Sequence, residues 1–115
     1  MQPNTYQQLA SRTLTAKPEK PLDDNESMLV WNALGLLGEA GEVGEHIKKA
    51  VFHRHELDPQ KLKKELGDVL WYLAALCTNL GLKLEDVMEA NIEKLAERYP
   101  DGFSSEASLN RSASS

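Results

Sequence analysis

Two long segments in the middle of the chain carry apolar residues at helical spacing, and they constrain the fold more than any other feature. The first runs from about Glu26 to about His53 and the second from Asp58 to Leu80. Apolar residues three and four apart share one face of a helix. The pattern predicts two amphipathic helices, with stripes at Leu29, Leu36, Ala40, Val43, Ile47 and Val51 and at Leu62, Leu66, Val69, Leu73, Leu76 and Leu80.

Residues at the ends of these segments are typical of helix boundaries. Asp58 is a capable N-cap and Pro59 suits the first helical position. Gly81 is a natural C-terminal stop. Residues 23–25, Asp-Asp-Asn, precede the first segment, and each of them can cap it. The short connection between the two helices predicts that they are antiparallel neighbours.

Two shorter segments complete the helical pattern. Asn4 can cap a first helix, and another helix is expected from about Leu84 to about Tyr99. No strand pattern and no internal repeat is visible. The sequence therefore predicts an all-α fold, a bundle of about four helices within one domain over residues 1–103. Residues 104–115, rich in serine and alanine, are expected to form a flexible tail.

The composition limits the possible partners and location. The chain of 115 residues has a formal net charge of −5, which argues against binding a nucleic-acid polymer and suits the collection of divalent cations. No apolar run is long enough to span a membrane, and no signal peptide is visible. The single cysteine, Cys77, reads as a core thiol and fits a reducing cytoplasm. A helical unit this small often gains core by oligomerising, so a dimer is plausible.

Two matched pairs of acidic residues border the predicted stripes. Glu39 and Glu42 are three apart in the first long helix, and Glu65 and Asp68 are three apart in the second. At about 100° per residue, each pair has the same angular offset, in the same sense, from its own apolar stripe. Antiparallel packing then brings the four carboxylates to one edge of the interface. Oxygen ligands of this kind suit magnesium or manganese, although acid pairs at this spacing are also common on solvated helix faces.

Glycines recur beside the acidic residues. Gly35, Gly38, Gly41 and Gly44 are spaced three apart in the first long helix, and Gly67 precedes Asp68. Each glycine in a helix interior costs about 0.8–1 kcal/mol relative to alanine. Close helix packing or room for a ligand beside the backbone would offset that cost.

The ordered motifs resemble those of the MazG-like nucleotide pyrophosphohydrolases, whose signature is Glu-x-x-Glu, a spacer, and Glu-x-x-Asp. Residues 38–43, Gly-Glu-Ala-Gly-Glu-Val, are similar to the first half, and residues 65–72, Glu-Leu-Gly-Asp-Val-Leu-Trp-Tyr, to the second. Residues 91–103 resemble the C-terminal segment of the family, and the region of residues 6–13 is similar more loosely. The resemblance covers nearly everything except the final dozen residues.

This resemblance implies an all-α homodimer or dimer of dimers that hydrolyses nucleoside triphosphates to monophosphates and pyrophosphate. It implies Mg²⁺ as the cofactor, with Mn²⁺ as a substitute, held by Glu39, Glu42, Glu65 and Asp68. Glu42 or Glu39 would take a proton from the attacking water, but the residues themselves do not choose among the four carboxylates.

Further side chains are candidates for binding the nucleotide. Asn91, Lys94 and Arg98 share one face of the last helix, where they either hold phosphate and sugar or complement the helix dipole. Tyr72 follows Asp68 by one turn and is expected either at the substrate or in the core. Trp31 is expected to stack on a base.

Other side chains are assigned to structure or surface. Trp71 points away from its stripe, towards a subunit interface or, less favoured, a base pocket. Glu45 is expected to be solvated, and His53 and His55 have no cysteine partners for a zinc site.

Three alternatives are weighed. A di-iron bundle needs Glu-x-x-His on two helices, and no histidine here is preceded by glutamate at that spacing. A non-catalytic helical interaction protein would show no magnesium-dependent stabilisation. A related hydrolase would act on another nucleotide diphosphate substrate, such as a phosphoribosyl-nucleotide.

Overall fold

A computed structural model describes residues 1–14, 17–103 and 109, and it confirms the all-α prediction. The helices are α1 (Pro3–Ala10), α2 (Asp24–Phe52), α3 (Pro59–Leu80) and α4 (Leu84–Arg98), with a 3₁₀ turn η1 (Ser11–Thr13) after α1. Among the described residues there is no β-strand, only an isolated bridge between Pro100 and Gly102. Apart from Leu109, the predicted tail over residues 104–115 lies outside the described residues.

The caps of the long helices follow the sequence prediction. Asp23 caps α2 in a reciprocal capping box: its carboxylate accepts from the backbone N–H of Glu26, and the Glu26 side chain accepts from the backbone N–H of Asp23. Asp58 caps α3, with Pro59 at the first position, and Gly81 ends it in the left-handed conformation at φ 69°. These local signals fix where the two long helices begin and end.

The predicted cap of the first helix is wrong. Gln2 occupies the N-cap of α1, without a side-chain hydrogen bond, and Pro3 is the first helical residue. Asn4 therefore lies inside the first turn. Proline explains the shift, since its fixed φ and missing N–H suit the first helical position.

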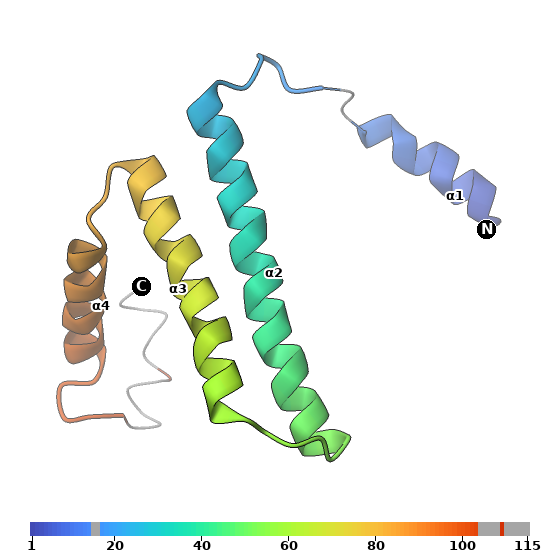
Figure 1. The fold of residues 1–115 in the computed structure, drawn as a ribbon. Coiled ribbons are helices and arrows are strands. Elements are labelled where there is room, and N and C mark those ends of the chain that lie inside the picture. The colour runs from blue at the N-terminus through green and yellow to red at the C-terminus, as the bar shows by residue number, and fades with distance from the viewer. Residues whose placement is uncertain (15–16, 104–108, 110–115) are drawn as a thin grey trace.

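Helices α2 and α3 form an antiparallel hairpin, which is the body of the molecule (Figure 1). The less exposed residues of α2 recur at alternating spacings of three and four: Leu29, Asn32, Leu36, Glu39, Val43, His46 and Ala50. A row with the same spacing runs along α3: Leu62, Glu65, Val69, Tyr72, Leu76 and Asn79. This spacing is that of a coiled-coil seam, and here every second position is polar. Ala74, Ala75 and Cys77 on α3 are also partly or fully buried but lie outside this row.

The hairpin seam consequently has a polar edge and an apolar edge. Several members of the predicted stripes lie exposed on the apolar edge instead of in the seam: Ala40, Ile47, Val51, Leu66, Leu73 and Leu80. Half of each predicted stripe lies in the seam as expected: Leu29, Leu36 and Val43 on α2, and Leu62, Val69 and Leu76 on α3. The other seam positions are taken by polar residues, among them Glu39 and Glu65, so the interface includes the acidic flank of each helix.

One end of the seam is held by asparagines. Asn32, which is 4% exposed, donates from Nδ2 to Oδ1 of Asn79 at 2.7 Å. Asn79 in turn donates to Oδ1 of Asn25 at 3.3 Å, and Asn25 donates to the backbone carbonyl of Asn79 at 3.2 Å. These bonds tie the start of α2 to the end of α3.

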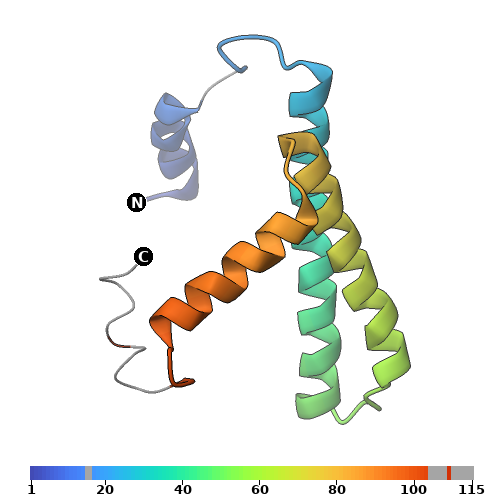
Figure 2. The same ribbon diagram turned by 90° about the vertical axis from the view of Figure 1, so that its left-hand side faces the viewer.

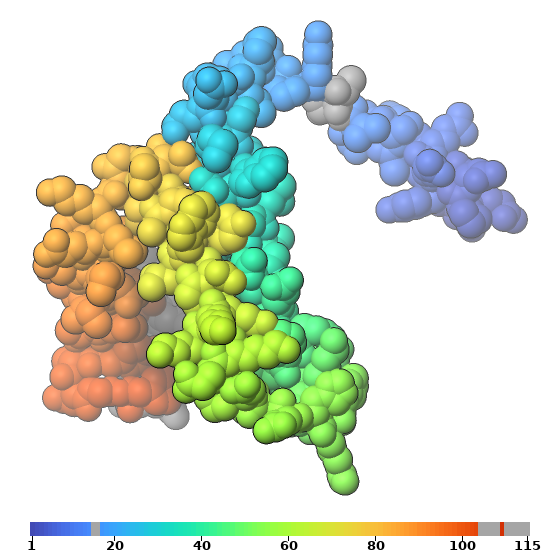
Figure 3. Space-filling model, in the orientation of Figure 1, coloured from blue at the N-terminus to red at the C-terminus, as the bar shows by residue number. Residues whose placement is uncertain are grey.

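The outer helices leave the hairpin. Helix α1 stands apart from α2 (Figures 1 and 3), and α4 starts beside the end of α3 and then diverges from it (Figure 2). The Cα radius of gyration is 20.2 Å, whereas a compact domain of this length has about 13 Å. Within the described residues, only Asn32 and Cys77 are buried, so the prediction of a core thiol is confirmed. No helix in the described part of the chain is long and apolar enough to cross a membrane.

Candidate metal and nucleotide site

The two acidic pairs lie on the polar edge of the hairpin, on facing helices. Glu39 and Glu65 are seam residues and are partly buried, while Glu42 and Asp68 lie one turn further round their helices and are exposed. Helix α2 supplies the glutamate pair and α3 supplies Glu65 and Asp68. The i, i+3 spacing thus gives each helix one inner and one outer carboxylate.

The four carboxylates act on one another electrostatically. The pKa of Glu39 is raised above its ordinary value of 4.5, by partial burial first, then by a hydrogen bond to Glu42 and by repulsion from Glu42, Asp68 and Glu65. An acid that is affected by the other three lies at their centre. The raised pKa of Glu39 thus supports the expectation from the sequence that the four acids lie near one another on one edge of the hairpin.

The donor set fits a hard divalent cation. Four carboxylates offer only oxygen ligands, which magnesium and manganese prefer, and their mutual repulsion is what a cation would relieve. In the described ranges, no three His, Cys, Asp or Glu side chains already lie close enough together to enclose an ion. Glu39, Glu42, Glu65 and Asp68 are the side chains that would hold such a cation, and they would have to move closer together to enclose it.

An open cleft of about 370 Å³ adjoins the carboxylates, lined by Glu39, Asp68, Trp71 and Tyr72. The two aromatic rings meet edge to face, with centroids 5.1 Å apart and planes at 86°. An aromatic ledge beside acidic groups has the chemistry to contact a nucleobase or a sugar next to a cation-bound phosphate.

Tyr72 reaches this cleft across a glycine. Its ring occupies the space where a side chain on Gly35 would be, and a Cβ there would collide with the ring. Close packing thus accounts for Gly35. No atom in the described part of the chain lies within 4 Å of a Cβ built on Gly38, Gly41, Gly44 or Gly67, so their helix cost is not offset by packing within this chain.

Other predicted binding residues lie away from the acids in this chain. Trp31 is 69% exposed and is not part of the cleft lining. Asn91 and Lys94 lie exposed on α4, and Arg98 is partly exposed with its buried Nε lacking a hydrogen-bond partner. Among the described residues, no hydrogen bond or ion pair joins these α4 residues to the carboxylates.

Sequence reasoning missed one contact at the site. His46 Nδ1 lies 2.6 Å from Oε2 of Glu65, across the seam. The signal was available, because His46 falls seven residues after Glu39 and so occupies the next equivalent seam position. Glu45 is exposed and pairs with Lys48 and Lys49 at 3.8 and 3.9 Å, as expected for a surface residue.

The fold and the site define the class of this protein: it is an all-α protein built on a helical hairpin, with a pair of acidic residues on each of the two facing helices. Residues 30–103 match the MazG nucleotide pyrophosphohydrolase domain, and the chain belongs to that family.

Two proteins are similar to this chain in sequence. The chain is 34% identical over 115 residues to the gene 37 protein of Mycobacterium phage L5, covering 96% of this chain and 100% of that protein. It is 36% identical over 73 residues to the uncharacterized protein YvdC of Bacillus subtilis strain 168, covering 56% of this chain and 69% of that protein. No solved structure matches.

Proposed function

We propose that the protein is a magnesium-dependent nucleoside triphosphate pyrophosphohydrolase, which converts an NTP or dNTP and water into the monophosphate and pyrophosphate. The observation that carries the proposal is the placement of Glu39, Glu42, Glu65 and Asp68 on one edge of the facing helices α2 and α3. The raised pKa of Glu39, caused first by partial burial and then by the other three acids, supports it. A bound cation would relieve the repulsion within such a group. Membership of the MazG family supports the reaction class.

Glu39, Glu42, Glu65 and Asp68 would hold Mg²⁺, and Mn²⁺ could replace it. Bound there, the cation offsets phosphate charge and makes water a better nucleophile. Glu42, the exposed member of the pair on α2, would take the proton of the attacking water, with Glu39 as the alternative base. The Tyr72 ring lies beside the acids, where its hydroxyl can contact the sugar or a phosphate.

Residues of α4 would bind the phosphates and the sugar of the nucleotide, and a tryptophan would stack on its base. Lys94 and Arg98 would bind phosphate oxygens and Asn91 a phosphate or the sugar. These residues stand away from the acids in one chain, so α4 must reach a site through closure of the chain or from another copy. Trp31 remains a candidate for base stacking, although the cleft lining favours Trp71.

We also propose that the working form is a homodimer or a dimer of dimers. The solvent-accessible surface is 10051 Å², whereas a compact monomer of this mass exposes about 6,300 Å². Part of the excess comes from the outer helices, which stand apart from the hairpin, and part from its apolar edge, where Leu66 is 54% and Ile47 44% exposed. A second copy on this edge would bury it while the carboxylates stay open to a cytoplasmic substrate.

The test is turnover of a panel of ribo- and deoxyribonucleoside triphosphates with Mg²⁺, with products resolved by anion exchange. Monophosphate and pyrophosphate are expected from the wild type and from Glu45→Gln, a control on the same helix outside the cluster. Asp68→Asn should lose activity. Diphosphate and orthophosphate would overturn the bond assignment. If no triphosphate is cleaved, a phosphoribosyl-nucleotide is the next substrate to test, and absence of a Mg²⁺-dependent rise in Tm favours a non-catalytic interaction protein.

A further inference from the structure

The bond between His46 and Glu65 spans the seam beside the proposed metal ligands. His46 lies one turn after Glu42 on α2, and its Nδ1 is 2.6 Å from Oε2 of Glu65 on α3. The side chains are 36% and 15% exposed, respectively. A contact this short to a partly buried carboxylate is a strong hydrogen bond. It fixes one oxygen of Glu65 towards α2.

The chemistry of the two groups decides the direction of this bond. An ionised carboxylate only accepts hydrogen bonds, so the imidazole must donate from Nδ1. The bond constrains the rotation of the Glu65 carboxylate about its terminal torsion, whose distribution is otherwise broad. With Oε2 engaged by His46, the orientation of Oε1 is set by the protein before any ligand arrives.

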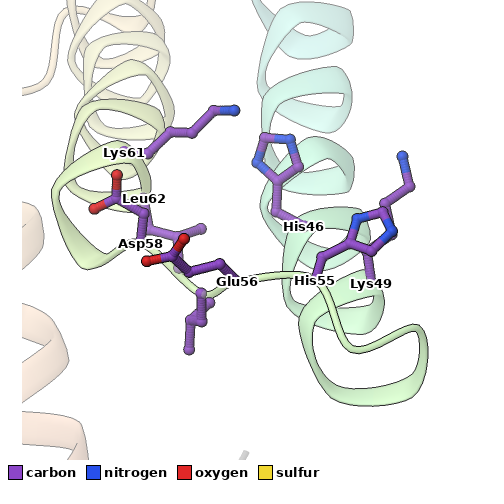
Figure 4. A pocket seen from close by; sticks show the side chains of 8 residues that line it. His46, Lys49, His55, Glu56, Asp58, Lys61 and Leu62 are labelled. Atoms are coloured by element: carbon purple, nitrogen blue, oxygen red, sulfur yellow. The ribbon is translucent and has the colours of Figure 1, made fainter.

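The surroundings of His46 show that no other described group takes over this role. His46 lines a cavity of about 200 Å³ where α2 is connected to α3, together with Lys49 and Lys61 (Figure 4). Of the polar side chains there, Lys49 pairs with Glu45 at 3.9 Å and Asp58 caps α3. In the described ranges, no hydrogen bond or ion pair joins the other polar lining residues, His55, Glu56 and Lys61, to Glu65. Four acidic residues form the candidate metal site: Glu39, Glu42, Glu65 and Asp68. Among the described residues, His46 is the one side chain outside these four that forms a hydrogen bond with any of them.

We propose that His46 is a positioning residue, which holds the Glu65 carboxylate in the orientation needed to bind the divalent cation. The inference rests on the proposed function, because Glu65 must be a ligand for its orientation to matter. Groups that orient a metal ligand through a hydrogen bond typically contribute 10–100-fold in metal affinity or activity. A merely structural pairing of α2 with α3 would instead affect the stability of the hairpin and leave cation affinity unchanged.

The test measures Mn²⁺ affinity without nucleotide, from the electron paramagnetic resonance signal of free Mn²⁺. His46→Leu removes the donor and should weaken Mn²⁺ binding by about 10–100-fold. His46→Asn places an amide nitrogen the same number of bonds from Cβ as Nδ1, so it should recover most of that loss. His46→Gln places its amide nitrogen one bond further out and should not. His53→Leu is the matched control, because His53 is exposed at the end of α2.

The outcomes separate this role from the proposed function. Wild-type affinity in His46→Leu overturns the role of His46 while leaving the enzyme proposal standing, even if the urea midpoint falls. Absence of Mn²⁺ binding by the wild type overturns both. If circular dichroism shows that His46→Leu is unfolded, the comparison of Asn with Gln decides, since equal Mn²⁺ affinities in these two variants overturn the proposal.

Discussion

The ring of Tyr72 on α3 lies directly over Gly35 on α2, in the space that any larger residue would fill. The aromatic wall of the cleft therefore depends on the missing side chain of a residue on the opposite helix. This relationship can be tested apart from catalysis.

Gly35→Ala is expected to destabilise the protein by about 1–3 kcal/mol, because the added methyl group forces the Tyr72 ring to move. In a Tyr72→Ala background the collision disappears, and the same substitution should stabilise α2 by about 0.8–1 kcal/mol through helix propensity. Urea denaturation of the four proteins of this double-mutant cycle measures both values. Equal effects of Gly35→Ala in the two backgrounds would show that the ring is not the obstacle.

The two tryptophans are expected to respond differently to nucleotide. Trp71 lines the cleft beside Asp68, whereas Trp31 lies outside that lining. Binding of a triphosphate should therefore quench fluorescence in Trp31→Phe and not in Trp71→Phe. Removal of the ring in Trp71→Ala should cost about 1–3 kcal/mol of nucleotide binding if a base stacks on it. The reverse pattern of quenching would restore Trp31 as the base contact.

The asparagine network should specify how α2 pairs with α3. Asn32→Ala leaves the side-chain oxygen Oδ1 of Asn79 without its donor, and this is expected to cost about 1–3 kcal/mol of stability. Replacing both asparagines by leucine should restore stability but loosen the register, because buried polar residues specify register in coiled coils at a cost in stability. Thermal denaturation measures the first effect and light scattering after size exclusion measures the second. A double leucine variant with a single well-defined size would remove the register role.

Glu39 should destabilise the folded protein when no cation is present. Its pKa is raised on folding, so the folded state holds this proton more tightly than the unfolded state does. Stability therefore falls as pH rises from the ordinary glutamate pKa through the raised value. Glu39→Gln should raise Tm at neutral pH without metal and reduce the gain in Tm that Mg²⁺ gives the wild type. Melting curves from pH 4 to 8 provide the test, and a variant that is less stable than the wild type at neutral pH contradicts it.

The apolar edge should control association. Leu73, which is 40% exposed on α3, belongs to this edge. Leu73→Asp is expected to shift the protein to monomer in sedimentation velocity at micromolar concentration. Thr78→Asp is the control, because it places the same charge at an exposed position on another face of α3. Dissociation by both variants would point to a general charge effect instead of a defined interface.

Local sequence signals predicted much of the fold. The N-cap of Asp58, the first-position Pro59 and the left-handed Gly81 act within one turn, so their prediction needs no knowledge of the partner helix. The long-range seam could not be predicted as well. Apolar stripes centred on Leu36 and Leu62 identified the facing sides, but the bond between His46 and Glu65 moves the seam towards the acids.

In the candidate site, the acidic edge could be predicted from the sequence, whereas the cleft beside it could not. The spacing of Glu39, Glu42, Glu65 and Asp68 indicated one acidic edge, because helical periodicity and antiparallel pairing are enough to define it. The cleft was not predictable, since it depends on the ring of Trp71 turning beside Asp68 from the back of its helix. No pattern in the sequence places α4 relative to that cleft.

The sparse interior of this chain has a consequence for how its amount in the cell determines its activity. With Cys77 and Asn32 as the buried residues of the described chain, the proposed association with another copy would supply much of the free energy that keeps the chain folded. Folding linked to association follows mass action, so the melting temperature rises with protein concentration. If the proposed association and activity hold, the chain would unfold and be degraded at low expression, and hydrolytic capacity would rise more steeply than in proportion to synthesis.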